Sequence, residues 1–235
     1  SIRDLYLKNE YIKKNPSLHE KDFEWKISKI VPFIDIIIKK NYINSNEINL
    51  LDVGGGAGLI LKEISNYIER SYNIRVKKYA LDLSPGMLAV QEKNNPNVRL
   101  LNEDICSTSL LNKEIDIALM IDVIEHIPNS DKALRELGRI SRFAIFKVPL
   151  EDSLISNAWN FLKQGQPRQN AIDTIGHINI YNPITLKSQI RQNGGSILNL
   201  FFTNVYEYFL ENELYAKRMS KKSKAYNIIA SQIFR

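Results

Sequence analysis

Short apolar runs alternate with segments of helical periodicity through the middle of the chain. The runs are six to eight residues long and end at glycine, proline or polar residues, which is typical of buried strands: 48–53, 76–83, 97–104, 115–122 and 142–149. Helical spacing of apolar residues predicts helices between them, over 57–69, 84–94 and 130–141. Apolar strands that alternate with helices predict a parallel sheet covered by helices on both faces.

The rhythm changes on either side of this block. Residues 22–40 have a helical pattern despite Pro32, and we expect them to cap the sheet. Residues 150–182 have polar breaks and no strong period, which favours an insertion. A helix ending at glycine is predicted over 183–195, and two later apolar segments, 196–206 and 225–234, predict strands.

Composition narrows the class of protein. Of 235 residues, 44% are hydrophobic and 25% charged, as in an ordinary globular protein. No apolar run approaches the roughly 20 residues that a membrane-spanning helix needs. The single cysteine, Cys106, excludes an internal disulfide, and residues 1–14 lack the apolar core of a signal peptide. We therefore expect a cytoplasmic protein without membrane insertion.

The net charge of +6 permits an acidic partner. The basic residues are spread along the chain, however, apart from the stretch 216–224. That stretch lacks the interleaved aromatic residues of a surface on which nucleic-acid bases stack. We interpret it as a solvated loop, with contact to a phosphate-bearing substrate as the alternative.

The stretch NLLDVGGGAGLILKEI, residues 49–64, raises the main functional question. Gly54, Gly56 and Gly58 form the pattern G-x-G-x-G between a predicted strand and a predicted helix. Glycine permits a sharp turn and lets a ligand approach the main chain, and the following helix N-terminus favours an anionic group. A simple strand-to-helix turn also favours glycine, so the pattern needs support from its surroundings.

Acidic residues at the ends of predicted strands give that support. Carboxyl ends of parallel strands meet at one edge of a sheet, so Asp52, Asp82 and Asp104 are expected around one ligand. Asp82 lies 24 residues after Gly58, where nucleotide-binding units place the acid that binds the ribose. Ser84 fits the cap of the next helix better than Asp82 does. Asp104 is placed to reach an adenine amino group, and Asp52 to receive an ammonium group or brace the loop.

Four stretches resemble, in order, the motifs of the class I S-adenosylmethionine-dependent methyltransferases: LLDVGGGAG, ALDLSPGML, NEDI and IDIALMIDVIEHIPN, within residues 48–149. The resemblance implies a Rossmann-like, doubly wound α/β sheet of seven strands, mostly parallel with an antiparallel last strand. It implies S-adenosylmethionine as cofactor and S-adenosylhomocysteine as product. Leu59 occupies the position where a dinucleotide-binding G-x-G-x-x-G pattern requires glycine.

The resemblance also assigns cofactor contacts by position. These are the glycines Gly54, Gly56 and Gly58 at the methionine part, Asp82 at the ribose, Met87 as an apolar wall, Asp104 and Ile105 at the adenine, and Asp122 in the segment bordering the sulfonium. We also expect Asp52 and Leu83 to bind the cofactor. Many relatives carry cysteine at the position of Gly55, and we expect little consequence from this departure.

Two histidines are the candidates for catalysis. His126 is expected to line the pocket beside the cofactor. His177, in IGHINIYN, falls in the region expected to bind the acceptor, and its ordinary pKa near 6.5 suits a general base. A histidine that only hydrogen-bonds a loop is the alternative. No group of histidines and carboxylates stands out as a metal site.

Trp25 and Lys26 are expected to fold over the pocket, with Lys26 near the carboxylate of the cofactor. One face of an amphipathic helix is the alternative role for both residues.

A narrower resemblance concerns the acceptor. NPSLHEKDFEWKISKI, FKVPLEDSL and IGHINIYNPITL are similar to segments of bacterial stand-alone methyltransferases of surface-glycan and secondary-metabolite pathways. This resemblance implies a sugar-like or other polar small molecule as the acceptor, and we expect its O-methylation. The alternatives are N-methylation of an amino sugar or other amine, RNA methylation, and cofactor binding without catalysis. Nucleic acid is disfavoured because no Asn/Asp-Pro-Pro-aromatic motif follows the fourth strand.

The expected organisation is a single domain over 1–235. Residues 1–45 form a helical cap, 46–149 the cofactor-binding core, 150–182 an insertion on the acceptor side, and 183–235 the last part of the sheet.

Overall fold

The computed structural model describes residues 22–152, 157, 160–166, 168–169, 172 and 176–203. The chain divides into two compact units, Ser1–Ile197 and Leu198–Arg235. The described helices and strands all belong to the first unit, and residues 198–203 of the second have no regular structure. The strand predicted over 225–234, the basic stretch 216–224 and His19 lie outside the described residues.

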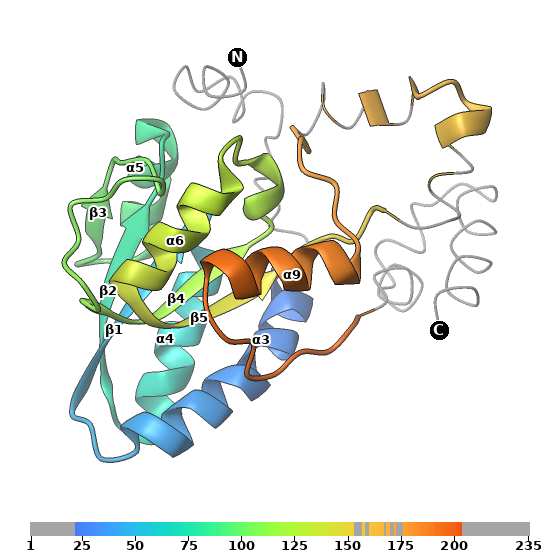
Figure 1. The fold of residues 1–235 in the computed structure, drawn as a ribbon. Helices are drawn as coiled ribbons and strands as arrows, with labels where there is room; N and C mark the ends of the chain where they lie inside the picture. The colour runs from blue at the N-terminus through green and yellow to red at the C-terminus, as the bar shows by residue number, and fades with distance from the viewer. Residues whose placement is uncertain are drawn as a thin grey trace, which may run out of the picture. The chain divides into compact units, whose positions relative to one another are not determined.

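A five-stranded parallel sheet forms the centre of the first unit (Figure 1). Its order is β3-β2-β1-β4-β5, and each neighbouring pair is parallel. The strands are β1 Glu47–Val53, β2 Arg75–Leu81, β3 Arg99–Leu101, β4 Ile115–Ile121 and β5 Ser141–Lys147. The order runs outward in both directions from β1 and β4, so the topological switch point, where doubly wound sheets bind ligands, lies between these two strands.

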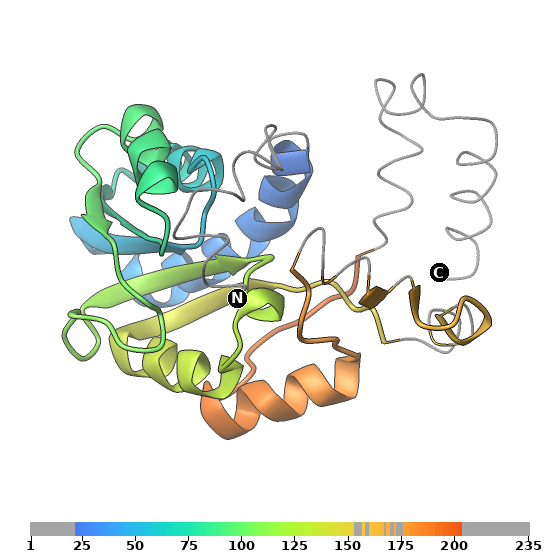
Figure 2. The same ribbon diagram turned by 90° about the horizontal axis from the view of Figure 1, so that it is seen from above.

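Helices cover both faces of this sheet, as the alternating pattern predicts. The apolar sides of α3 Phe23–Ile37, α4 Leu59–Tyr72 and α5 Pro85–Asn94 pack in one core, and those of α6 Ser130–Ile140 and α9 Pro183–Asn193 pack in the other. The two helix layers stand on opposite sides of the strands in Figure 2. A π-helical turn, η2 Ile38–Tyr42, continues α3, and a 3-10 turn, η3 Ile124–His126, follows β4.

Burial on both faces explains the nearly continuous apolar sequence of the central strands. Six of the seven β4 residues are buried, because helices cover both of its faces. Ser84 caps α5 as predicted: its Oγ accepts a hydrogen bond of 3.2 Å from the Met87 amide, and Pro85 opens the helix. The cap leaves Asp82 for another role.

The structure differs from the expected sheet at its C-terminal side. Among the described residues the sheet has five strands, and the expected seven strands with an antiparallel last strand are not shown. Residues 196–203 are irregular where the pattern predicts a strand. An apolar run becomes a strand only when a sheet edge pairs with it, and no described strand does so here. None of the described helices is long and apolar enough to span a membrane.

Candidate functional site

A cavity of about 600 Å³ opens at the carboxyl ends of the strands, next to the switch point. Its walls come from the glycine loop after β1, the segment after β2, the turn after β3, and the residues that follow β4 and β5. Helix α3 and His177 close two further sides. Segments far apart in the sequence therefore share one site.

The glycine loop has the backbone conformation that the sequence predicts. Gly54, Gly56 and Gly58 have φ angles of +63°, +57° and +74°, a region that other residues rarely adopt. The Gly54 amide donates a hydrogen bond of 2.8 Å to the Leu81 carbonyl, which ties the loop to the end of β2. The main chain of the loop thereby forms part of the cavity wall.

Gly55 has a reason of its own to be glycine. A Cβ atom added there would lie 1.8 Å from Oδ2 of Asp52 and 2.2 Å from its carboxyl carbon. The Asp52 carboxylate therefore lies against the main chain of the loop. Any side chain at position 55 would have to displace it.

Two buried carboxylates, Asp52 and Asp82, face the cavity from the ends of β1 and β2. Burial, together with the charge of Asp82, raises the pKa of Asp52 to about 7, and its Oδ2 has no hydrogen-bond partner in the described part of the chain. Burial also raises the pKa of Asp82 to about 6, against backbone hydrogen bonds that include one of 2.8 Å from the Ser84 amide. A buried carboxylate without a partner is costly, so Asp52 favours a cationic ligand.

The other predicted contacts with the cofactor's nucleoside lie along the same wall. Leu83, Met87, Asp104 and Ile105 all line the cavity. Met87 and Ile105 are buried apolar side chains, while Oδ1 of Asp104 accepts a hydrogen bond of 2.9 Å from the Cys106 amide. The structure thus brings together the acidic and apolar groups that the strand ends predict.

Helix α3 contributes Lys26 but not Trp25 to the cavity wall. Nζ of Lys26 lies 3.0 Å from carboxylate oxygens of both Asp22 and Asp122. The aromatic residue from α3 that lines the cavity is Phe23, and Trp25 is not among the lining residues. Lys26 thus fastens the helix to the segment after β4.

Asp122 is the centre of an ion-pair network at the end of β4. Its Oδ1 also lies 2.5 Å from Nζ of Lys147, and its backbone has a φ of +56°. Burial alone would raise the pKa of Asp122, but Lys147 and Lys26 hold it below its usual value. The network fixes the segment that the resemblance places beside the sulfonium.

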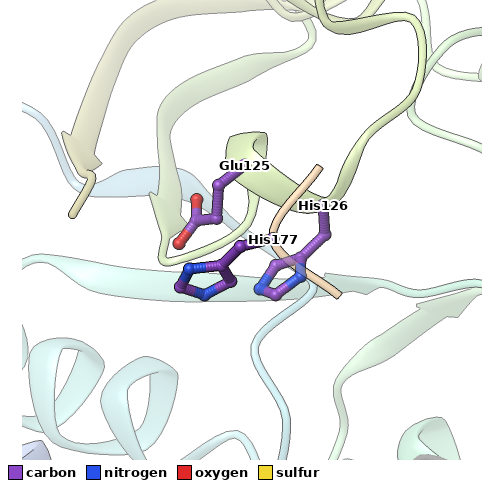
Figure 3. Close-up of side chains that lie close together, drawn as sticks. All are labelled: Glu125, His126 and His177. Atoms are coloured by element: carbon purple, nitrogen blue, oxygen red, sulfur yellow. The ribbon is translucent and has the colours of Figure 1, made fainter. Parts of the chain in front are cut away.

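The segment after the insertion returns to this turn and brings His177 beside His126 (Figure 3). The two imidazole rings are 4.9 Å apart between centroids, in an edge-to-face arrangement. The amides of Ile178 and Asn179 both donate hydrogen bonds of 3.0 Å to the Glu125 carbonyl. The Asn179 side chain donates to the carbonyls of Ile124 and Ile127, at 3.0 and 2.8 Å.

Each histidine is held by an acceptor at Nδ1. In His177, Nδ1 is 2.8 Å from Oε1 of Glu151, and in His126 it is 3.1 Å from the Gly176 carbonyl. Burial lowers the pKa of His177, but the hydrogen bond and charge of Glu151, together with the charges of Glu125 and Asp122, raise it overall. A carboxylate bonded to one ring nitrogen orients the other for proton transfer.

Sequence reasoning missed Glu125, Glu151 and Asn179. Glu125 is almost fully buried, and burial raises its pKa to about 7. Its carboxylate and one ring nitrogen each of His126 and His177 lie within 4.8 Å of one another. The sequence hides this group because residues 127–176 separate His177 from the other two, although the pair Glu125–His126 was a local signal.

Comparisons with known proteins identify the core. Residues 51–142 match a family described as "Methyltransferase domain". The match covers 92 of the 235 residues and agrees with the resemblance of this segment to the class I S-adenosylmethionine-dependent methyltransferases. This match supports S-adenosylmethionine as the cofactor. No curated protein has a significantly similar sequence.

Solved structures support the methyltransferase fold. A chain from the complex of the Haloferax volcanii Trm112 methyltransferase activator with a putative methyltransferase is 15% identical, with a TM-score of 0.54 over 83% of this chain and 76% of that one. A putative methyltransferase from an antibiotic biosynthesis pathway of Anabaena variabilis is 14% identical, with a TM-score of 0.50 over 86% and 83%. YcgJ of Bacillus subtilis is 22% identical, with a TM-score of 0.49, and the match covers 68% of this chain and 66% of YcgJ, just under two thirds.

Proposed function

We propose that this methyltransferase transfers a methyl group from S-adenosylmethionine to a hydroxyl group of a polar, sugar-like small molecule, with His177 as the general base. One observation carries the proposal: His177, whose ring Glu151 holds through Nδ1, lines the same cavity as the buried acids at the strand ends. The narrower resemblance to glycan-pathway methyltransferases supports the sugar-like acceptor. Its segment IGHINIYN supplies His177.

The residues present fit the cofactor. In the proposed arrangement, Asp82 accepts hydrogen bonds from the ribose hydroxyls, and Asp104 with Ile105 contacts the adenine. Asp52 pairs with the ammonium group of the methionine part, because its Oδ2 is buried and no described residue hydrogen-bonds to it. Lys26 is engaged by two carboxylates, so we assign it to bracing the Asp122 segment rather than to the cofactor's carboxylate.

The bound cofactor supplies an electrophilic methyl group on a positively charged sulfur, which is a good leaving group. The protein must then align the acceptor oxygen with that methyl carbon and remove the hydroxyl proton. The His177 ring takes this proton as the oxygen–carbon bond forms and the carbon–sulfur bond breaks. Glu151 holds the ring through Nδ1 and stabilises its protonated form.

A specific observation favours a second candidate, N-methylation of a small amine. Among the residues that line the cavity, acidic side chains outnumber lysines by seven to three: Asp22, Asp52, Asp82, Glu103, Asp104, Asp122 and Glu125 against Lys26, Lys132 and Lys147. A wall with excess negative charge attracts cations. An amino sugar would satisfy this charge and could accept the methyl group on nitrogen.

Calorimetric titration with S-adenosylmethionine and S-adenosylhomocysteine tests the cofactor site. We expect micromolar binding to the wild type and at least tenfold weaker binding to Asp82→Asn, because the variant loses a charged acceptor. Glu92→Gln, which removes an exposed carboxylate on α5, is the matched control. Equal affinities for wild type and Asp82→Asn would contradict the ribose assignment.

His177→Gln tests the general base. We expect cofactor affinity close to wild type and turnover reduced by about 10²-fold or more, the usual contribution of a general base. Turnover is measured as S-adenosylhomocysteine formed from a panel of sugars and amino sugars. A wild-type rate in His177→Gln would remove the residue from this role.

A further inference from the structure

The methyl-transfer mechanism proposed above gives no role to the buried carboxylate of Glu125. Only 1% of the residue is exposed, and among the described residues neither carboxylate oxygen has a hydrogen-bond partner. A buried, unpaired carboxylate costs several kcal/mol or stays protonated. Asp122, nearby in sequence, is neutralised by Lys26 and Lys147, whereas Glu125 has no such ion pair among the described residues.

The two neighbouring histidines have the hydrogen bonds that metal-binding histidines have. A ligating imidazole almost always donates its other ring N–H to a carbonyl or carboxylate, which fixes its tautomer and orientation. In His126 that acceptor is the Gly176 carbonyl, and in His177 it is Glu151. When Nδ1 donates, the lone pair of the neutral ring lies on Nε2.

The spacing of the three groups leaves room for one ion. Their ligand atoms all lie within 4.8 Å of one another, so one point lies no more than about 2.8 Å from each. Bonds from histidine nitrogen or carboxylate oxygen to zinc are about 2.0–2.2 Å long, so a shift of roughly 0.6 Å per ligand would close the site. Figure 3 shows the Glu125 carboxylate and the two rings gathered at one place, from η3 and the segment that crosses it.

We propose that Glu125, His126 and His177 bind a divalent transition-metal cation of the zinc or manganese type. Two imidazoles and one carboxylate are ligands that suit such ions. Three protein ligands leave at least one coordination position, and the cavity that all three residues line would supply the acceptor to it.

This inference rests on the proposed methyl transfer but changes the role of His177 from general base to ligand. With the cation bound, the His177 nitrogen is a ligand, and the acceptor hydroxyl binds the cation through its oxygen. The cation lowers the pKa of that hydroxyl, and its proton passes to water. The oxygen then bonds to the methyl carbon as the carbon–sulfur bond breaks, which releases S-adenosylhomocysteine.

Calorimetric titration of chelator-treated protein with Zn²⁺, and Co²⁺ absorption spectroscopy, test the site directly. We expect one cation per chain, with at least tenfold weaker binding to Glu125→Gln and His177→Asn. The matched control is Glu92→Gln, which removes an exposed carboxylate on α5. Absence of Zn²⁺ and Co²⁺ binding, or affinities unchanged in Glu125→Gln, would overturn the proposal.

S-adenosylhomocysteine binding and turnover of the same chelated protein separate this inference from the proposed function. The cation site predicts that cofactor affinity survives chelation, that turnover falls at least tenfold, and that added Zn²⁺ or Mn²⁺ restores it. Full turnover without a cation, still dependent on His177, would overturn the cation site and keep the free ring as base. Loss of S-adenosylhomocysteine binding in metal-loaded protein would instead contradict the proposed function.

Discussion

The close approach of Gly55 to Asp52 leaves no room for a side chain at position 55. A Cβ atom at position 55 would meet the Asp52 carboxylate at 1.8 Å, and that carboxylate is buried beneath the loop. We expect Gly55→Ala to displace Asp52 and weaken S-adenosylhomocysteine binding about tenfold or more, measured by calorimetry. This expectation differs from the sequence-based one, which assigned little consequence to the glycine.

Gly165→Ala is a suitable control for that substitution. Its added Cβ meets no atom within 4 Å, although the φ of +80° carries its own strain. We expect Gly165→Ala to lower the melting temperature slightly and leave the cofactor affinity intact. If Gly55→Ala binds as tightly as wild type, the position of Asp52 is not set by the glycine.

Some individual site residues could be predicted from sequence and others could not. Asp52, Asp82 and Asp104 stand at strand ends, and parallel pairing brings strand ends together, so local sequence sufficed. Glu125 and Glu151 gain their roles only through His177, whose position depends on a long chain excursion. Local pattern carries no information about such a return.

The short segment 177–179 depends on Asn179 for its attachment to the turn after β4. The Asn179 side chain donates two hydrogen bonds to that turn, at 3.0 and 2.8 Å. Asn179→Ala should lose about 1–2 kcal/mol of local stability, since each such bond contributes about 1 kcal/mol. We expect lower turnover with nearly unchanged S-adenosylhomocysteine affinity, and faster amide hydrogen exchange at Ile178.

Asn157→Ala provides the comparison for Asn179→Ala. Asn157 is exposed and donates its side-chain hydrogen bond to Asp152 instead of to the turn after β4. Its loss should change neither turnover nor exchange at Ile178. Identical behaviour of the two variants would show that Asn179 does not position His177.

The carboxylates at the ends of β1 and β2 should make the cofactor affinity depend on pH. The pKa of Asp52 is raised to about 7 and that of Asp82 to about 6, so both carboxylates gain protons as the pH falls from 8 to 5. Protonation removes the charge that attracts the ammonium group of the cofactor. The affinity for S-adenosylhomocysteine should therefore fall with decreasing pH, by at most about tenfold per pH unit for each proton taken up.

Calorimetry between pH 5 and pH 8 measures this dependence. Asp52→Asn should bind more weakly at pH 8 and lose the part of the slope near pH 7. An affinity that is constant across this range in the wild type would show that neither carboxylate changes protonation on binding.

The sequence predicted some helices and strands better than others. The alternation of apolar strands and amphipathic helices predicted the five parallel strands and the helices on both faces, because burial on both sides imposes that pattern. Residues 196–203 are equally apolar but irregular. The apolar pattern of a segment does not show whether a sheet edge is available to pair with that segment.

The charge of the cavity opposes that of the chain as a whole. The chain has a net charge of +6, yet seven acidic side chains and three lysines line the cavity. The net charge of the chain therefore does not predict the charge of the acceptor, because the residues that line the cavity determine which molecules enter it. The phosphate-bearing acceptor considered from the sequence finds fewer free cations here, since Lys26 and Lys147 are paired with Asp122.

The sign of this charge leads to a prediction about the acceptor that can be tested without knowing its identity. We expect the enzyme to prefer neutral or amine-bearing acceptors over phosphate-bearing ones of the same skeleton, because like charges repel in a confined cavity. A panel of glucose, glucosamine and glucose 6-phosphate, assayed by S-adenosylhomocysteine release, compares the three charges on one scaffold. The phosphate should have a kcat/KM at least roughly tenfold below the better of the others, a difference of about 1.4 kcal/mol. Preference for glucose 6-phosphate would mean that the acceptor binds beyond the acidic wall. For glucosamine, mass analysis of the product fragments would show whether oxygen or nitrogen receives the methyl group.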